Sequence, residues 1–187
     1  MCHDITRSGD FYRLLFSIDQ GLASDARAAG CPCGGALHRA NYPRKPRGLD
    51  SAIRSICSFR LSFCCAVCRR RTTPESVRFF GRRVYVAAIL ILVSATRASA
   101  GTAAAARLLD GCVPVATIRR WRRWWREDFP SLPFWRLGRA EFAPPVDVAL
   151  APASLLERFT EPRLERTLRW LSPLTKPDTM VRQRAGR

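Results

Sequence analysis

The amino-acid sequence predicts a mainly α-helical protein with a small β element that carries paired cysteines. Three observations lead to this fold class: apolar residues at helical spacing near both ends, two cysteine pairs flanking a strand-like segment, and a long apolar stretch followed by a strongly basic helix. The 187 residues suffice for one ordinary domain or for two or three very small ones. A hydrophobic fraction of 47% is enough for a buried core and argues against wholesale disorder.

The first predicted element is an amphipathic helix near the N-terminus. Its apolar side chains recur at intervals of three and four, which places them on one face: Phe11, Leu14, Leu15, Ile18 and Leu22. Asp10 is expected to cap the start of this helix, and Gly30 suits its end. On this pattern Tyr12, Arg13 and Asp19 face away from the core, and the helix contributes no chemistry.

Two cysteine pairs carry the clearest chemical signal in the sequence. Cys31 and Cys33 precede two glycines, and Cys65 and Cys68 follow a strand-like stretch with C-x-x-C spacing. A short turn of this kind holds two thiolates at one edge of a tetrahedron. Two such pairs predict a four-coordinate structural zinc site within a small β ribbon.

Other ligand sets remain open in the same region. The first pair is one residue shorter than the usual spacing, and the gap of 31 residues between the pairs exceeds the common ~15–20. Cys64 could replace Cys65, and His38 could replace Cys33; free buried thiols around a turn are the remaining possibility. The other cysteines have no partner at useful spacing and are expected to behave as small hydrophobic residues: Cys2, Cys57 and Cys112.

Positive charge dominates the composition and is concentrated in the middle of the chain. Lys and Arg number 32 against 15 acidic residues, which gives a net charge of +17 at pH 7. All but two of the bases are arginine, which binds phosphate and guanine in a bidentate way, although GC-rich coding would produce the same bias. Residues 39–83 contain twelve bases and two acids, and residues 84–126 contain seven bases and one acid. Such a field favours polyanions: DNA, RNA or an anionic membrane surface.

Basic side chains cluster around the predicted cysteine site. They form three groups, in a proline-interrupted loop, after the last paired cysteine, and at a strand predicted over residues 76–80: Arg44, Lys45 and Arg47; Arg69, Arg70 and Arg71; and Arg78, Arg82 and Arg83. Only Asp50 and Glu75 oppose these charges within residues 39–83. A phosphate-contacting surface is therefore a better interpretation than a merely solvated face.

Residues 84–128 show the order of elements found in a helix-turn-helix. The stretch 84–95 is apolar on nearly every side and predicts a buried helix, well short of the ~20 residues that a membrane span needs. A short helix over 102–109 and a glycine-containing turn follow. Pro114 then suits the start of a third helix that runs to about Asp128. This order is typical of DNA-binding units; a plain helical bundle with a basic rim is the alternative.

The third helix is predicted to bury one face and to expose the other. Ile118, either Trp121 or Arg122, and Trp125 fall on the face expected in the core. The tryptophans could instead stack on single-stranded bases, but their helical spacing favours burial. The opposite face offers side chains to bases and phosphates of the major groove: Thr117, Arg119, Arg120 and Arg123.

These motifs resemble a known family. Cysteine knuckles, a Thr-Pro-containing strand, a buried helix and the string Val-Ala-Thr-Ile-Arg-Arg-Trp at residues 115–121 resemble the zinc-ribbon/helix-turn-helix proteins of bacterial insertion sequences. The resemblance covers about residues 31–128. It implies that the ribbon and the helical unit together bind the DNA ends of a mobile element, and that the Thr-Ile-Arg-Arg-Trp string begins the recognition helix.

Nothing in the sequence indicates a catalytic site. An acid-triad nuclease core needs far more than the 60 residues that follow Glu127. His3 and His38 are the only histidines, so a paired-histidine nuclease motif is absent, and no glycine-rich phosphate loop precedes a Lys-Ser or Lys-Thr pair. No serine or cysteine nucleophile has a histidine in a plausible position. The sequence therefore predicts a binding protein and not an enzyme.

The C-terminal third is predicted to contain a proline-rich connector and one amphipathic helix. Leu155, Leu156 and Phe159 begin its apolar face, Pro162 can restart it, and the face serves either as core or as a dimer surface. The predicted fold is thus mainly α with a small β zinc ribbon, in this order: N-terminal helix 1–30, zinc ribbon with basic loops 31–83, helix-turn-helix 84–128, connector 129–151, C-terminal helix 152–171 and flexible tail 172–187.

Together these features predict a zinc-containing protein that binds double-stranded DNA and is encoded by or associated with a mobile element. The expected partners are duplex DNA and either a transposase chain or a second copy of the protein. No signal-peptide pattern is visible and no stretch is long enough to span a bilayer, so we expect a cytoplasmic protein without a membrane partner. Two alternatives stay open: an RNA-binding or ribosome-associated zinc-ribbon protein, and a truncated transposase subunit that lacks its catalytic domain.

Overall fold

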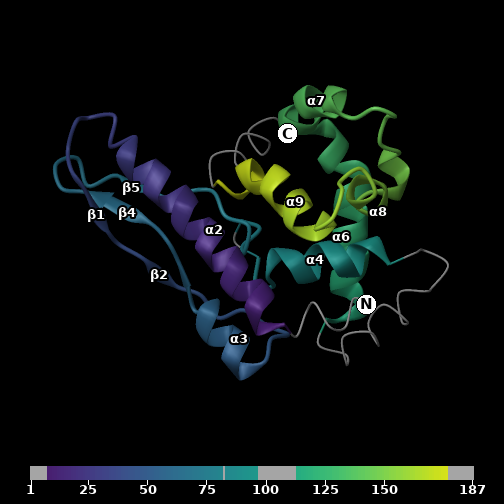
Figure 1. Cartoon of the computed structure of the whole chain (residues 1–187), viewed down its shortest axis with the longest axis horizontal. Helices are drawn as coiled ribbons and strands as arrows, with labels where there is room; N and C mark the ends of the chain where they lie inside the picture. The colour runs from purple at the N-terminus through teal and green to yellow at the C-terminus, as the bar shows by residue number, and fades with distance from the viewer. Residues whose placement is uncertain (1–7, 82, 97–112, 177–187) are drawn as a thin grey trace. The chain divides into compact units, whose positions relative to one another are not determined.

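The structure, a computed structural model of the whole chain, describes residues 8–81, 83–96 and 113–176 (Figure 1). These residues are mostly helical, with a small antiparallel sheet and a cluster of cysteines. They divide into two compact units. We call the first, residues 8–86 with 169–176, the cysteine unit, and the second, residues 87–168, the helical unit, in both cases without the undescribed positions.

The cysteine unit begins with the long helix α2, Gly9–Ala28, which confirms the predicted N-terminal helix. Its cap is Ser8 and not Asp10, because the Ser8 side chain accepts a hydrogen bond of 3.3 Å from the backbone N–H of Phe11. Asp10 instead pairs with Arg13 on the surface at 2.6 Å. After the helix the chain turns at Gly30, whose φ of 71° lies in the left-handed region that glycine tolerates.

The buried face of α2 differs from the prediction. Leu14 is 44% exposed, whereas Tyr12 and Asp19 are fully buried. The residues of α2 that lie in the core are Tyr12, Leu15, Ile18, Asp19 and Ala23. The helix is rotated relative to the apolar pattern because Asp19 binds groups inside the cysteine unit.

A three-stranded antiparallel sheet holds the cysteine-bearing turns. Its order is β1, Leu37–Arg39, then β4, Phe63–Cys65, then β5, Arg71–Thr72. A second, two-stranded sheet pairs β2, Tyr42–Pro43, with β3, Phe59–Arg60. The helix α2 runs along the first sheet (Figure 1), and the residues that form the small core of this region are Ala23, Cys31, Leu37, Leu61, Phe63 and Cys65.

The short helix α3, Ser51–Ile56, connects the two strands of the second sheet. The strand predicted over residues 76–80 does not form; within it only Phe79 makes an isolated bridge, to Val86. This segment is buried instead, and Arg78, which the sequence placed on a phosphate-contacting surface, has no exposed side chain. Arg60 is likewise buried, with a relative exposure of 2%. Arg82 lies outside the described residues.

The helical unit contains the predicted buried helix and the predicted basic helix. The first, α4, spans Ala87–Ala95, and almost all of its side chains are buried. The second, α6, spans Val115–Glu127 and packs against α4. Across this contact Arg122 donates hydrogen bonds to the carbonyl and hydroxyl oxygens of Thr96, at 2.7 and 2.8 Å. The predicted short helix over 102–109 and its turn lie outside the described residues.

Short helices take the place of the predicted connector and of the single C-terminal helix. The aromatic rings of Phe129 and Trp135 are buried beside α6, with their centroids 5.0 Å apart. The predicted helix over 152–171 is interrupted after Leu156 and resumes at Arg163, directly after Pro162, where the sequence predicted a restart. The remaining helices are η1 Phe129–Ser131, α7 Pro133–Gly138, η2 Arg139–Glu141, η3 Val148–Leu150, α8 Ala153–Leu156, α9 Arg163–Trp170 and η4 Ser172–Thr175.

The start of the predicted flexible tail is structured. Within the cysteine unit, the Ser172 hydroxyl donates to a carboxylate oxygen of Glu75 at 2.8 Å, and the Thr175 hydroxyl accepts from the backbone N–H of Ser76 at 2.9 Å. Lys176 adds an ion pair of 3.0 Å to Glu75. The Glu75 carboxylate is therefore paired with side chains of the segment 172–176. Among the helices that the structure describes, none is long and apolar enough to cross a membrane.

Candidate metal centre and basic surfaces

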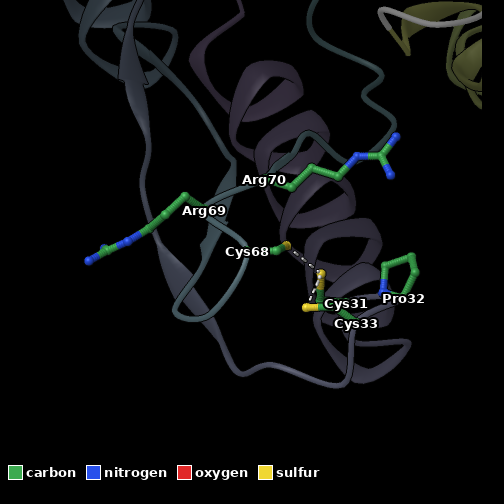
Figure 2. Close-up of a pocket in the computed structure, with 6 residues that line it drawn as sticks. All are labelled: Cys31, Pro32, Cys33, Cys68, Arg69 and Arg70. Atoms are coloured by element: carbon green, nitrogen blue, oxygen red, sulfur yellow. Dashed lines mark hydrogen bonds between the residues drawn. The ribbon is translucent and has the colours of Figure 1, made fainter.

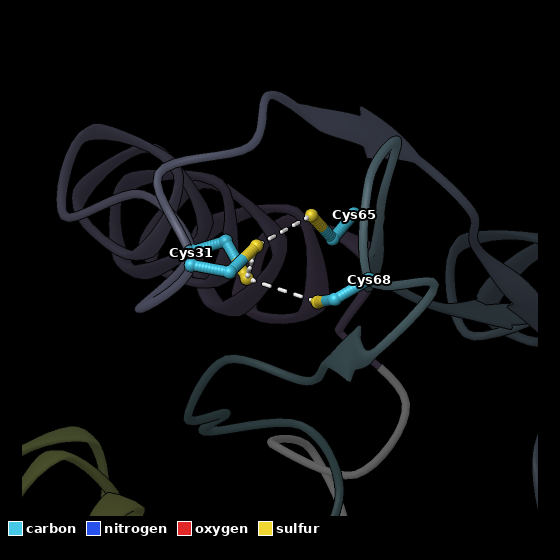
Figure 3. A group of neighbouring side chains, drawn as sticks. Cys31, Cys65 and Cys68 are labelled. Atoms are coloured by element: carbon cyan, nitrogen blue, oxygen red, sulfur yellow. Dashed lines mark hydrogen bonds between the residues drawn. The ribbon is translucent and has the colours of Figure 1, made fainter.

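Four cysteine sulfurs meet at one point of the cysteine unit. The Sγ atoms of Cys31 and Cys33 are 3.4 Å apart, those of Cys33 and Cys65 are 3.4 Å apart, and those of Cys31 and Cys68 are 3.5 Å apart (Figure 3). All four sulfurs lie within 4.8 Å of one another. These are the four residues that the sequence predicted as ligands, and they are close enough to hold one metal ion.

Two tight turns present these sulfurs from opposite sides. In the first turn the backbone N–H of Gly34 donates to the carbonyl of Cys31 at 2.8 Å. In the second, the N–H of Arg69 donates to the carbonyl of Cys65 at 3.2 Å, and the N–H of Cys65 donates back to the carbonyl of Arg70 at 3.0 Å. Arg69 has a φ of 58°, an uncommon conformation for a residue with a side chain. It turns the chain sharply after Cys68.

Strand pairing brings the two turns together. The register of β1 with β4 places Leu37 opposite Cys65, so the turn that precedes β1 lies beside the turn that follows β4. Gly35 lies where the first turn packs directly against the second. A Cβ atom at this position would lie 2.6 Å from the sulfur of Cys65 and 2.9 Å from the Cβ atom of Val67. A side chain here would push the two cysteine pairs apart.

The alternative ligands lie elsewhere. Successive side chains of a strand point to opposite faces, so Cys64 faces away from the sulfur of Cys65. The register pairs Cys64 with His38, which puts both on the face opposite the cluster. The Cys64 thiol instead contacts the carbonyl of Arg69 at 3.5 Å. Cys57 is fully buried, as predicted for a small hydrophobic residue. Cys2 and Cys112 lie outside the described residues.

Proximity drives the acidities of the first cysteine pair apart. The backbone N–H of Gly35, together with the neighbouring thiols, lowers the pKa of Cys33 to about 6. The N–H of Cys33 acts to lower the pKa of Cys31, but hydrogen bonding to the Cys33 thiol and burial outweigh it and raise that pKa to about 12. One thiol of this pair therefore ionises at the expense of the other.

The second pair behaves in the same way. The backbone N–H groups of Cys68 and Val67 lower the pKa of Cys65, against the effect of burial. The N–H of Arg70 acts to lower the pKa of Cys68, but its contacts with the thiols of Cys33 and Cys65 raise it overall. Four thiols this close cannot all ionise by themselves, whereas a divalent cation at their centre would stabilise four thiolates together.

The sulfur geometry fits a tetrahedral metal ion. Four Zn–S bonds of about 2.3 Å place the sulfurs of a regular tetrahedron about 3.8 Å apart. The observed distances of 3.4 and 3.5 Å, with an upper limit of 4.8 Å, bracket this value. Four cysteine ligands also close the coordination sphere, so the arrangement suits a structural ion and leaves no position for a catalytic water.

Basic side chains flank the open side of this cluster. A hollow beside it is lined by Cys31, Pro32, Cys33, Cys68, Arg69 and Arg70 (Figure 2). Cys33 and Cys68 are exposed towards solvent, as are Arg69 and Arg70. In Figure 2 the side chains of Arg69 and Arg70 border the hollow and extend away from the cysteine sulfurs.

The other basic residues predicted to bind nucleic acid differ in how far contacts within the protein fix their side chains. The Arg71 guanidinium donates to the carbonyl of Ala40 and to the hydroxyl of Ser62, both at 2.6 Å, and lies 5.7 Å from the centre of the Tyr42 ring. Arg71 therefore connects β5 to the segments around Ala40 and Ser62 and stabilises the sheet. Arg44 is half-buried and donates to the carbonyl of Arg83, and the loop that carries Lys45 and Arg47 lines a second hollow.

The helix α6 presents its arginines as the sequence predicted. Ile118, Trp121 and Trp125 are buried, and Trp125 is fully so. The exposed face of α6 carries Arg119, Arg120, Arg123 and Arg126, and Thr117 is half-buried. No acidic residue occurs from Val115 to Arg126. This face of α6 is therefore both exposed and strongly basic.

Arg54 is the basic residue of the second hollow that the sequence analysis did not single out, whereas Arg44, Lys45 and Arg47 were predicted. The turn through α3 brings Arg54 to the loop of residues 44–48, and no local motif signals this contact.

Comparison with protein-family models, with curated proteins and with solved structures finds no match to this chain. Its function must therefore be inferred from its own residues.

Proposed function

We propose that the protein binds one Zn²⁺ through Cys31, Cys33, Cys65 and Cys68 and binds double-stranded DNA through α6. The observation that carries the DNA part is the division of α6 into a buried aromatic face and an exposed face of four arginines. Its 13 residues span about 20 Å, a length suited to insertion into the major groove. Arginine at base edges reads guanine, and at phosphates it supplies affinity.

The proposed role of zinc is to organise the ribbon. Thiolate ligands favour Zn²⁺ over the hard cations, and a site with four cysteines is structural in character. The core beneath the cluster is small, so that metal binding and folding of this region are expected to be coupled. The zinc thereby holds β1 and β4 in register.

The resemblance to zinc-ribbon/helix-turn-helix proteins of insertion sequences leads us to place this chain with a mobile element. It would act there as a transposase accessory or regulator, in the cytoplasm, alone or with a transposase chain or a second copy. A ribosome-associated or RNA-binding role and a truncated transposase subunit are the rival functions. A helix that enters the major groove separates DNA binding from the RNA-binding rival, because the deep, narrow major groove of A-form RNA does not admit it. An adjacent reading frame with an acid-triad pattern would favour the truncated transposase subunit.

The metal part is tested by two matched serine variants. We expect purified protein to contain one zinc per chain, and Cys68→Ser to lose both the metal and the folded ribbon. Cys64→Ser is the control, because this neighbouring cysteine lies on the opposite face of the sheet. Zinc content by atomic emission and thermal unfolding report the result. Wild-type protein that folds equally well without zinc would contradict the proposal.

The nucleic-acid part is tested by competition at fixed salt. A labelled DNA duplex is bound to the zinc-loaded protein and displaced by unlabelled duplex DNA or by structured RNA. We expect duplex DNA to displace the label at lower concentration. Preferential displacement by RNA would replace the DNA proposal with the RNA-binding alternative. Sequencing of DNA recovered with the purified protein identifies the site.

A further inference from the structure

A second hollow lies in the cysteine unit, away from the cluster. It is formed where the loop of residues 44–48 meets α3 and the chain at Val84. Four cations line it, and no acidic residue does: Arg44, Lys45, Arg47 and Arg54. In the described part of the chain, none of these four forms an ion pair with a carboxylate.

The loop is fixed from both sides. The backbone N–H of Arg44 donates to the carbonyl of Ser58 at 2.7 Å, and that of Arg47 donates to the carbonyl of Val84 at 2.8 Å. Gly48, with a φ of 73°, turns the chain back towards α3. These contacts fix the backbone of the loop, and the guanidinium groups of Arg44 and Arg54 also donate to the carbonyls of Arg83 and Leu49.

Arg44 is the most constrained of the four. It is half-buried, it donates to the carbonyl of Arg83, and its guanidinium carbon lies 5.2 Å from the centre of the Phe79 ring. Burial of this cation disfavours its charged form, and its pKa is lowered accordingly. A half-buried guanidinium without a carboxylate partner is a group that an incoming anion would stabilise.

The two basic hollows of this unit differ in electrostatics. Arg69 and Arg70 lie beside the cysteine cluster, whose thiolates reduce the positive potential there. The second hollow has no such compensation among its lining residues. Like charges held together repel, and an anion placed among them offsets this repulsion.

We propose that this second hollow is a phosphate-binding site and that its occupant is a backbone phosphate of the bound DNA. The assignment of a phosphate group rests on the lining residues, and the assignment of its source rests on the proposed function. Arginine fits the group because its planar fork can make two hydrogen bonds to phosphate oxygens. Such a contact would anchor the duplex at a second point, independent of base reading by α6.

The first measurement uses inorganic phosphate, titrated calorimetrically into the zinc-loaded full-length protein. The test variant is Lys45→Gln with Arg47→Gln, two exposed side chains of the hollow whose removal leaves the Arg44 packing intact. The control is Arg27→Gln with Arg39→Gln, which removes the same charge from exposed positions of the same unit outside the hollow. We expect the test variant to bind phosphate about tenfold or more weakly and the control to match wild type. No binding by wild type, or equal weakening in both variants, overturns the site.

The second measurement identifies the source of the phosphate. Duplex affinity is measured over a range of salt concentrations for the same proteins. Loss of this one phosphate contact should reduce the slope of log K against log salt by about one in the test variant and by less in the control. The test variant could lose phosphate binding and still show the same slope of log K against log salt for duplex DNA as the control. That result would overturn the DNA phosphate as the occupant and would indicate free phosphate instead. If wild type binds phosphate but no duplex, the proposed function fails and the anion site stands.

Discussion

Arg78 donates a hydrogen bond of 2.8 Å from its Nε atom to the carboxylate of Asp19, and both side chains are fully buried. The same carboxylate accepts from the hydroxyl of Ser76 and from the backbone N–H of Val77, each at 2.7 Å. Asp19 therefore fastens the middle of α2 to a segment that has no regular secondary structure. Buried charge of this kind is tolerated because the carboxylate and the guanidinium neutralise each other, and the Nη1 atom of Arg78 also donates to the carbonyl of Ile56.

Loss of this contact should destabilise the cysteine unit strongly. Asp19→Asn keeps the shape of the side chain but leaves the buried Arg78 guanidinium without its counterion, at an expected cost of about 3–5 kcal/mol in the free energy of unfolding. The matched control is Asp10→Asn, since Asp10 pairs with Arg13 on the surface of the same helix. We expect the control to unfold close to wild type. Urea denaturation measures both, and similar unfolding midpoints would show that the buried pair contributes little.

The same contact explains why the face of α2 was predicted incorrectly. The apolar periodicity of residues 11–22 favours burial of Leu14, yet Leu14 is exposed and Asp19 is buried. Periodicity reports only the spacing of hydrophobic residues. It cannot detect a carboxylate whose hydrogen-bond partners lie 57–59 residues later in the chain. By contrast the basic helix was predicted almost to the residue, because Ile118, Trp121 and Trp125 repeat at strict helical spacing.

The cysteine site, like the basic helix, could be predicted because it depends on local spacing in the sequence. Each turn is a local feature, legible from the spacing of two cysteines and the glycines beside them. The choice of Cys65 over Cys64 was open because it depends on the register of β1 with β4, a contact between distant segments. The basic loop of residues 44–48 was legible from the sequence, but the approach of Arg54 to it depends on the fold through α3 and has no sequence signal.

Gly35 should be required for metal affinity because its Cα atom lies against the cysteine cluster. In Gly35→Ala the new methyl group would meet the sulfur of Cys65 at 2.6 Å, so the two turns must separate. We expect zinc affinity to fall by about 10- to 100-fold in a competition with a chelating dye. Gly21→Ala adds the same methyl group to α2 in open space and should leave zinc affinity unchanged. Equal affinities of the two variants would show that the turns can move without loss of the site.

The buried thiol of Cys57 should make the protein less stable at alkaline pH. Burial, opposed by the charge of Arg78, raises the pKa of Cys57 from 9.0 to about 11. Between these values the unfolded chain releases this proton while the folded protein retains it, so the free energy of unfolding falls as pH rises. The loss is on the order of 1–3 kcal/mol across the window. Cys57→Ala removes the titrating group, and its stability should fall less steeply with pH in parallel urea titrations of zinc-loaded proteins. Parallel curves for the two proteins would contradict this.

Base reading and phosphate binding should be separable by two arginine variants. Arg120 lies on the exposed face of α6, whereas Arg70 lies beside the cysteine cluster. If Arg120 is bidentate to guanine, Arg120→Ala should cost about 1–3 kcal/mol on the preferred sequence and much less on random DNA. Arg70→Ala should weaken binding to all sequences alike and reduce the slope of log K against log salt by about one.

The comparison requires a preferred sequence, obtained by selection from a random duplex library, and titrations of both variants on that sequence and on random DNA. Arg136→Ala on α7 is the control for loss of one exposed charge from the helical unit. The two variants are expected to differ in kind. Arg120→Ala should reduce the ratio of the affinity for the preferred sequence to the affinity for random DNA. Arg70→Ala should change the salt dependence of binding. If both weaken binding to all DNA equally, α6 does not read bases. The protein is then a nonspecific polyanion binder, and the assignment of a helix-turn-helix must be abandoned.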